Sequence, residues 1–99
     1  MVVEIIRYHI ASESSEHFVQ AYKEAGVFLE NSEHCLSYEV IRGVEEPDHF
    51  IVRIEWDSVE GHMQGFRTSP DFQKFFALVK PFFNAILEMK HYSMIDKVV

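Results

Sequence analysis

The sequence contains few of the residues that form disulfides or bind nucleic acids. Its single cysteine, Cys35, has no partner within the chain, which favours a reducing compartment. Nine Lys and Arg residues are outnumbered by sixteen Asp and Glu residues. The resulting formal net charge of −7 argues against nucleic acid or an anionic membrane surface as a partner. No repeat, linker or low-complexity segment interrupts the chain.

Long apolar runs are also absent. No run approaches the ~20 residues that a transmembrane helix requires. The first ten residues include the acidic Glu4 and no small-residue cleavage site, so we do not expect a signal peptide. We expect a cytoplasmic protein in which residues 1–99 form one domain around a single core.

Aromatic residues, in contrast, are plentiful, and the stretch Asp48–Phe72 contains several of them at regular spacing. Alternating apolar positions predict a strand that ends in the only tryptophan: Phe50, Val52, Ile54 and Trp56. The pattern Asp57-x-x-Glu60 then predicts a helix start. The Asp57 carboxylate would accept a backbone N–H of the first turn, and the Glu60 side chain would reach back to the cap residue. A tight corner therefore follows the tryptophan.

The corner is expected to carry a short helix and then a second one. Helical spacing predicts an apolar stripe that includes a histidine: Val59, His62, Met63 and Phe66. Ser69 is a predicted N-cap, and Pro70 suits the first helical position because its missing N–H is not needed there. Pro81 is expected to end or kink this helix, with Phe82 and Phe83 packing beneath it.

The remaining periodicities complete the element order. Strands are predicted over residues 2–10, Cys35–Gly43 and about Ile86–Ile95, a helix over roughly Glu13–Asn31, and an antiparallel hairpin between the two central strands. This order is that of an α+β, ferredoxin-like β-α-β-β-α-β sandwich with a four-stranded antiparallel sheet. Because the strands are apolar on both sides, we expect the uncovered sheet face to pair with a second copy in a homodimer.

Several short motifs, taken in order, resemble the antibiotic biosynthesis monooxygenase (ABM) family of dimeric α/β barrels. They are Glu55-Trp56, Ser58-Val59-Glu60, Thr68-Ser69-Pro70-Asp71-Phe72 and Val79-Lys80-Pro81. The resemblance covers nearly the whole chain. It implies a dimer with a pocket between sheet and helices, which oxidises small quinols or polycyclic phenols with O₂ and without metal or flavin.

A subset of that family binds and degrades haem, and the chain departs from its pattern. Where the subset has an iron-ligating histidine in the third helix, this chain has Phe75 and Phe76. Where the subset has an asparagine in the first strand, it has Arg7 and His9. No H-x-x-x-H or C-x-x-C spacing occurs either. We therefore expect no metal and no cofactor.

Oxygenation without a cofactor requires a base and a dry pocket that holds the substrate anion. His62 is the candidate base. In the alternative interpretation His62 is a structural residue at the core boundary, bonded to a backbone carbonyl. The candidate substrate-binding residues are Trp56, Phe66, Tyr38, Tyr92, Arg7 and His9. Arg7 and His9 can hold an anionic oxygen or can pair across the sheet with Glu39 or Glu55 instead.

Two functions remain open at this point. The first is a homodimeric monooxygenase that oxidises a small hydroxylated aromatic or quinol with O₂. The second is a non-catalytic dimeric module that binds a small apolar ligand in the same pocket. The family resemblance favours the first. Fold by itself does not imply function, so this preference depends on the resemblance.

Overall fold

The computed structural model describes residues 1–98 and has the predicted β-α-β-β-α-β order. The strands are β1 (Val2–His9), β2 (Cys35–Arg42), β3 (His49–Trp56) and β4 (Ile86–Ser93), and the α-helices are α1 (Ser15–Glu30) and α2 (Pro70–Val79). Short 3-10 turns precede α1 (η1, Ser12–Ser14) and flank α2 (η3, Phe66–Thr68; η4, Lys80–Ala85). The ferredoxin-like fold is confirmed, with element ends shifted by one or two residues from the predicted ones.

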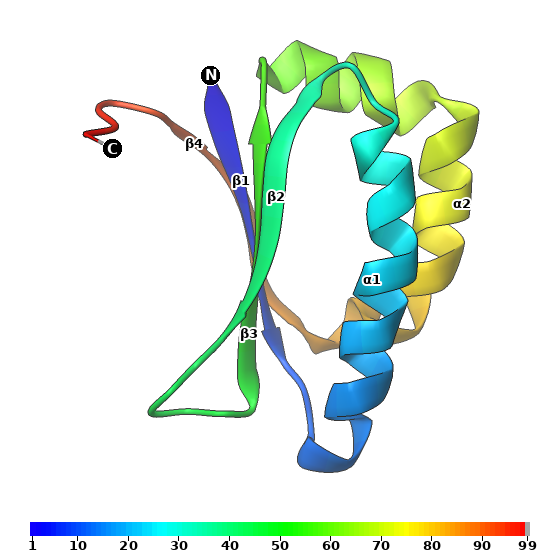
Figure 1. The fold of residues 1–99 in the computed structure, drawn as a ribbon, viewed down its shortest axis with the longest axis vertical. Coiled ribbons are helices and arrows are strands. Elements are labelled where there is room, and N and C mark those ends of the chain that lie inside the picture. The colour runs from blue at the N-terminus through cyan, green and yellow to red at the C-terminus, as the bar shows by residue number, and fades with distance from the viewer. Residues whose placement is uncertain (99) are drawn as a thin grey trace.

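The four strands form one sheet in the order β2-β3-β1-β4, and every neighbouring pair is antiparallel. The register between β1 and β3 pairs Val2 with Trp56 at one end and His9 with His49 at the other. Both α-helices lie on the same side of this sheet (Figure 1). The other side carries no helix.

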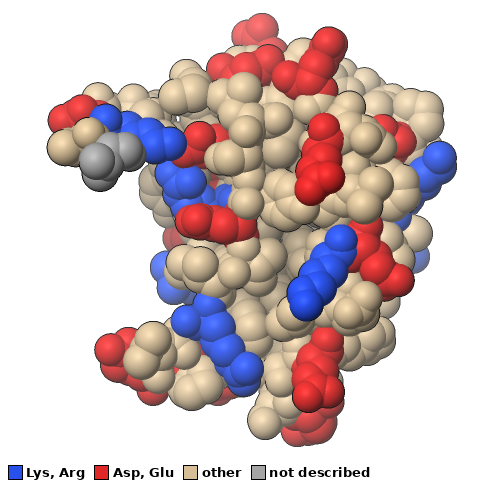
Figure 2. All heavy atoms as spheres, viewed as in Figure 1, with Lys and Arg blue, Asp and Glu red and all other residues tan. Residues whose placement is uncertain are grey.

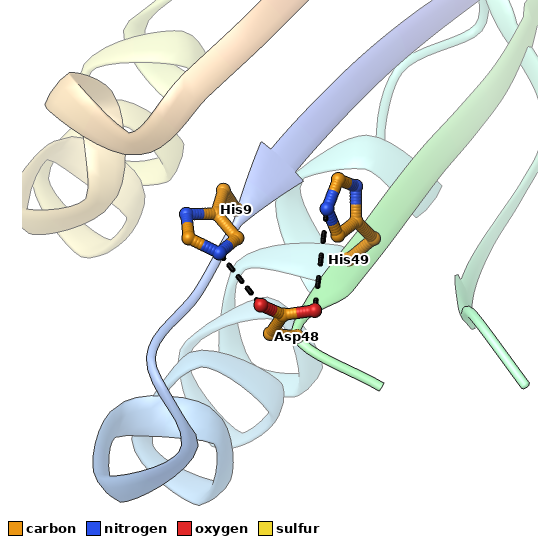
Figure 3. Close-up of side chains that lie close together, drawn as sticks. All are labelled: His9, Asp48 and His49. Carbon is orange, nitrogen blue, oxygen red and sulfur yellow. Dashed lines mark hydrogen bonds and ion pairs between the residues drawn. The ribbon is translucent and has the colours of Figure 1, made fainter. Parts of the chain in front are cut away.

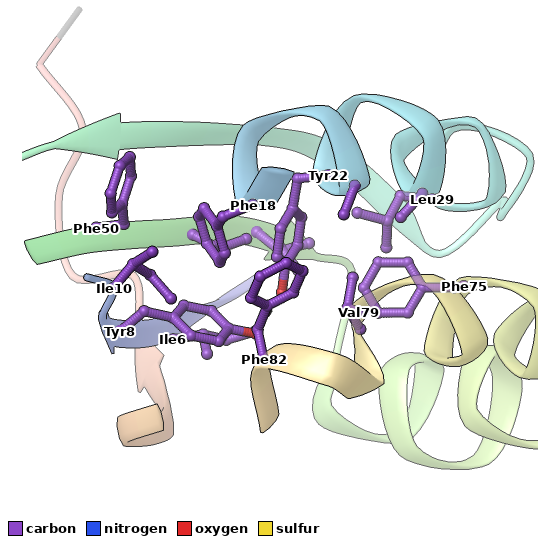
Figure 4. Packing of buried hydrophobic residues seen from close by; sticks show 14 of the residues in the cluster. Ile6, Tyr8, Ile10, Phe18, Tyr22, Leu29, Phe50, Phe75, Val79 and Phe82 are labelled. Atoms are coloured by element: carbon purple, nitrogen blue, oxygen red, sulfur yellow. The ribbon is translucent and has the colours of Figure 1, made fainter. Parts of the chain in front are cut away.

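The core lies between the sheet and the two helices (Figure 4). Tyr8 from β1 and Phe50 from β3 contact the ring of Phe18 in α1, with ring centres 4.8 and 4.9 Å apart. Tyr22 of α1 contacts Phe75 of α2 at 6.1 Å. Contacts between aromatic rings therefore connect the sheet with both helices. Each fully buried ring contributes roughly 1.5–3 kcal/mol of transfer free energy.

The corner after Trp56 differs from its prediction in two respects. The first is the cap: the hydroxyl of Ser58, not the carboxylate of Asp57, accepts the N–H of Gly61 at 2.9 Å. Asp57 instead bonds the Nδ1 atom of His34 at 2.9 Å, which connects the corner to the start of β2. The predicted Asp57–Glu60 capping box is therefore wrong, because another partner occupies Asp57.

The second difference is the helix type, since Gly61–Gly65 (η2) is a π-helical turn. Such a turn contains more residues than an α-helical one, so positions four apart share a face while positions three apart do not. His62 and Phe66 point inward, with exposed fractions of 6% and 2%, whereas Val59 and Met63 are 43% and 37% exposed. The predicted four-residue stripe is thus half right.

Two glycines of this corner allow the chain to pass close to His34. A side chain added at Gly61 would collide with Asp57 and His34, and one added at Gly65 would collide with the His34 ring. The imidazole of His34 therefore covers the backbone of η2 where no side chain stands. This close approach fixes the position of the turn that carries His62.

The start and end of α2 follow the sequence prediction. Ser69 caps the helix by accepting the N–H of Phe72, and Pro70 occupies the first position. The α-helix ends at Val79, before Pro81, and continues as η4. Of the two following phenylalanines, Phe82 is buried but Phe83 is 45% exposed, so only one of them packs as expected.

The helix-free face of the sheet is less apolar than the sequence suggested. It carries Ile5, Ile51 and Tyr92, but charged residues such as Arg7 and Arg53 lie among them. Met89 points to the opposite face, toward the helices. Acidic and basic side chains are also interspersed over the part of the surface seen in Figure 2. Within residues 1–98, no helix is both long and apolar enough to cross a bilayer.

The Ser69 cap provides a test of how α2 is held. Replacing Ser69 by Ala removes the acceptor for the Phe72 N–H and is expected to lower the free energy of unfolding by about 1 kcal/mol. Urea unfolding followed by circular dichroism measures this. Ser12→Ala is the matched control, because the side chain of that exposed serine forms no hydrogen bond in the described residues. Equal stability of the two variants would show that the cap is not used.

Candidate functional site

A cavity lies between the helix-facing side of the sheet and α2, and three of the predicted site residues line it. These are Trp56 at the end of β3, His62 in η2 and Phe66 in η3. The corner after Trp56 brings η2 and η3, which carry His62 and Phe66, back over the end of β3. Most of the remaining lining is apolar, contributed by β1, β3, β4, α1, α2 and η4.

The imidazole of His62 is stacked on the indole of Trp56. The two ring centres are 4.3 Å apart and the planes differ by 11°. Trp56 is in turn held from β1, because its Nε1–H donates to the buried carboxyl of Glu4 at 3.1 Å. Phe66 contacts the other part of the indole, with centres 5.3 Å apart. The histidine is therefore oriented by a flat aromatic surface whose own position is fixed by a hydrogen bond.

Both ring nitrogens of His62 face polar partners. Nδ1 lies 2.7 Å from Nε2 of His91 on β4, and Nε2 lies 3.6 Å from Oε1 of Glu4. In one arrangement of protons both nitrogens of His62 have a partner: His91 donates to His62 Nδ1, and His62 directs its Nε2–H at Glu4. In the other neutral arrangement His62 donates to His91. In both arrangements Glu4, His62 and His91 form a short path for a proton from the core to the edge of the sheet.

Burial changes the pKa values of these three groups. It raises the pKa of Glu4, although the Trp56 hydrogen bond and the Arg67 charge oppose the rise. Burial, with smaller effects of His91 and Arg67, lowers the pKa of His62 from 6.5 to about 4. The pKa of His91 is lowered as well, again mainly by burial. At neutral pH the imidazole of His62 is therefore uncharged. When its Nδ1–H is donated to His91, Nε2 keeps a lone pair that no hydrogen bond among residues 1–98 uses.

A second polar group in the cavity wall is a pair of tyrosines. The hydroxyls of Tyr8 and Tyr22 are 2.6 Å apart and both residues are buried. Burial raises the pKa of Tyr8 to about 12 and holds the pKa of Tyr22 well above its usual value, so both remain protonated. Only one of the two protons can lie between the oxygens. The other has no partner among residues 1–98 besides this pair, which leaves one O–H donor for a ligand or water.

The cavity is small in this conformation. It offers about 50 Å³ to the centres of water molecules, whereas a single water needs about 10–15 Å³. An aromatic ligand therefore requires side chains at the opening to turn outward. Arg67, which packs over Phe72 at 5.1 Å, and the half-exposed Phe83 both line the cavity and have solvent to turn into.

The other predicted site residues lie outside this cavity. Tyr38 packs over Gly26 of α1 and donates its hydroxyl hydrogen to Glu30 at 3.2 Å. Tyr92 and Arg7 are on the helix-free face of the sheet. His9 bonds Asp48 rather than Glu39 or Glu55. Strand alternation directs Arg7 and Tyr92 to the other face of the sheet. Tyr38 faces the helices, but it lies on the edge strand β2 under α1, away from His62.

The sequence did not point to four polar residues that line the cavity, Glu4, Tyr8, Tyr22 and Arg67, or to His91, which bonds His62. A signal for two of them was present. Glu4 and Tyr8 share one face of β1 with Ile6, so this alternation places an acid and a phenol on the same side of the strand. For His91 no local signal exists, because only the β1–β4 register brings it opposite Glu4.

Comparisons with known proteins link this chain to a family. The family described as antibiotic biosynthesis monooxygenase (ABM) matches residues 1–78. The uncharacterized protein YczJ of Bacillus subtilis is 25% identical over 93 residues, which cover 94% of this chain and 98% of that protein.

Two solved structures show the same fold. A Bordetella bronchiseptica protein that bears the family's name has a TM-score of 0.78 at 22% identity, covering 95% of this chain and 96% of its own. SnoaB of Streptomyces nogalater, a cofactor-independent oxygenase, has a TM-score of 0.80 at 10% identity, covering 98% of this chain and 95% of its own.

The protonation of His62 is directly measurable. Its ring signals in NMR should titrate near pH 4 and should not change between pH 6 and 7. The unfolded chain binds this proton near pH 6.5, so the histidine makes the fold less stable as pH falls from about 6.5 to 4. The raised pKa of Glu4 acts in the opposite direction above pH 4.5, so the ring signal is the measurement of choice.

His91→Ala should move the pKa of His62 upward, since it removes a neighbouring charge and admits water. A midpoint between pH 6 and 7 in the unaltered protein would contradict the buried position of the ring.

Proposed function

The chain belongs to the antibiotic biosynthesis monooxygenase family, and from that premise we propose that it oxidises a small hydroxylated aromatic or quinol with O₂, without a metal or flavin. The observation that carries the proposal is the composition of the cavity. Its walls are aromatic and aliphatic, and its polar groups are gathered at Glu4 and His62 and at the two tyrosine hydroxyls. Such a site suits a flat ring that carries oxygen substituents.

The proposed first step is removal of a hydroxyl proton from the substrate. His62 is neutral and donates its Nδ1–H to His91, so its Nε2 atom accepts the proton. The Glu4 carboxylate beside Nε2 then stabilises the positive charge on the ring. A histidine with a pKa of about 4 is a weak base alone, so the accepting unit is the His62–Glu4 pair rather than the imidazole by itself. The free tyrosine O–H holds a second substrate oxygen.

The electron-rich anion then reacts with O₂. One oxygen atom becomes bonded to a ring carbon, and the other leaves as water with the hydrogen of that carbon and the hydrogen of the phenolic hydroxyl, so a phenol and O₂ yield a quinone and water. Aromatic walls exclude water from the anion and from the reduced oxygen species. In this proposal Trp56 and Phe66 contact the face of the substrate ring, and His62 contacts its hydroxyl.

We also propose that the working form is a homodimer. Members of this family are typically dimeric. The helix-free sheet face, with Ile5, Ile41, Ile51 and Tyr92, is the surface that a second copy would cover. Charged residues among these, such as Arg7 and Glu88, are then available for pairing across the interface.

Sedimentation tests the dimer. At micromolar concentration the protein should sediment at about twice 11.6 kDa. Ile51→Glu places a charge in the middle of the sheet face and should shift the distribution toward monomer. Unaltered protein that sediments as a single species of 11.6 kDa would refute the dimer but would leave the cavity chemistry untouched.

His62→Ala tests the chemistry. The unaltered protein should consume one O₂ per quinone formed from a naphthol, or per hydroxyquinone formed from a hydroquinone, without releasing H₂O₂. In the His62→Ala variant kcat should be lower by about 10²- to 10⁴-fold. An oxygen electrode and the quinone absorbance give both quantities. His17→Ala is the matched control, because His17 is an exposed histidine on α1 and does not line the cavity.

The same experiment separates the two candidate functions. Binding of a quinol without any O₂ uptake would identify a non-catalytic binding module. Turnover that is unchanged in a folded His62→Ala protein would leave the oxygenase but remove His62 from the reaction. A His62→Ala protein that is less stable but responds to the ligand as the unaltered protein does would show that His62 is structural.

A further inference from the structure

Three potential metal ligands meet at the end of the sheet opposite the corner (Figure 3). His9 ends β1, His49 begins β3, and Asp48 precedes it in the turn from β2. One ligand atom from each residue can be chosen so that all three lie within 4.8 Å of one another. None of the three lines the cavity that holds His62.

Backbone contacts hold the three residues in place. His9 and His49 are directly opposite each other in the β1–β3 register. The N–H of Ile10 donates to the carbonyl of Asp48 at 2.7 Å, and the N–H of His49 donates to the carbonyl of Glu46 at 2.9 Å. The imidazoles and the carboxylate therefore project from a fixed frame rather than from a loose loop, which lowers the entropic cost of binding an ion.

The ligand atoms require only small movements. Nε2 of His9 lies 2.7 Å from Oδ2 of Asp48, and Nε2 of His49 lies 4.0 Å from Oδ1. Tetrahedral Zn²⁺ with bonds of about 2.0–2.1 Å sets its ligand atoms about 3.3 Å apart. A rotation of the Asp48 carboxylate lengthens the first distance and shortens the second. The side chains are partly exposed, so nothing in the packing prevents this rotation.

A fourth ligand is adjacent. Oε2 of Glu46 lies 3.0 Å from Nε2 of His49, on the exposed side of the cluster. Arg7 and Arg42 line the neighbouring groove, but within residues 1–98 neither forms an ion pair with Asp48 or Glu46. Arg42 instead donates to the Pro47 carbonyl and lies over the Phe50 ring. The carboxylates are therefore available to a cation.

We propose that His9, Asp48 and His49 bind one divalent transition metal ion of the Zn²⁺ type, with Glu46 or water completing the shell. Two imidazoles and one or two carboxylates favour such ions over Mg²⁺ and Ca²⁺, which prefer sites made of oxygen alone. The sequence gives no hint of this site, because thirty-eight intervening residues separate His9 from the Asp48-His49 pair. The ion would connect β1 to the turn that begins β3, apart from the proposed oxidation chemistry.

The test uses chelator-treated protein without a histidine tag. Titration calorimetry with Zn²⁺ should give one equivalent per chain, and Co²⁺ should bind with visible absorption typical of a four-coordinate ion. Removing an outer-shell partner commonly costs 10–100-fold in affinity, so His9→Ala and His49→Ala, which remove direct ligands, should each weaken binding by at least about tenfold. Asp48→Asn keeps the shape of the side chain and should weaken binding as well.

Two control variants make the assignment specific. His17→Ala removes an exposed histidine outside the cluster and should bind Zn²⁺ as the unaltered protein does. His91→Ala breaks the His62–His91 pair, the other place where two imidazoles lie together, and should also leave binding intact. Loss of binding in His91→Ala with retention in His9→Ala would overturn the proposal. So would binding of less than a tenth of an equivalent by the unaltered protein.

Discussion

The hydrogen bond from the indole of Trp56 to the carboxyl of Glu4 organises the site. Glu4 is an acid on the helix-facing side of the sheet, where a buried polar group without a partner costs about 1–3 kcal/mol or more. The indole N–H meets that need, and in doing so fixes the plane on which His62 stacks. His62 then brings in His91. A single acid in β1 thus determines the position of groups from β3, η2 and β4.

The corner depends on a second polar contact, outside the core. Asp57 bonds His34 rather than capping the following turn, and the His34 ring lies over the side-chain-free backbone of Gly61 and Gly65. Ser58 takes over the cap. The result is a π-helical turn, which directs His62 and Phe66 inward together. π-Turns are uncommon and often occur at functional sites, which fits the placement of this one.

Periodicity predicted the fold well because strands and helices leave regular patterns. The alternation up to Trp56 and the Ser69-Pro70 helix start were visible in local sequence and were both confirmed. The site was predicted only in part. His62, Trp56 and Phe66 are close in sequence and line one cavity, while Glu4 and His91 are opposite each other only through strand register. Tyr38 and Tyr92 were proposed from residue type alone. The place of each strand in the sheet and the face that each side chain occupies were not known. Residue type cannot supply that information until the pairing of the strands is known.

The small volume of the cavity has a consequence for binding strength. If the cavity binds a ring as proposed, only the fraction of molecules in which Arg67 and Phe83 have turned outward can admit it. The apparent dissociation constant equals the intrinsic constant divided by that fraction. A substitution that trims a side chain at the opening therefore tightens binding without adding a contact to the ligand. Affinity in this protein is set as much by how often the opening is clear as by what lines the interior.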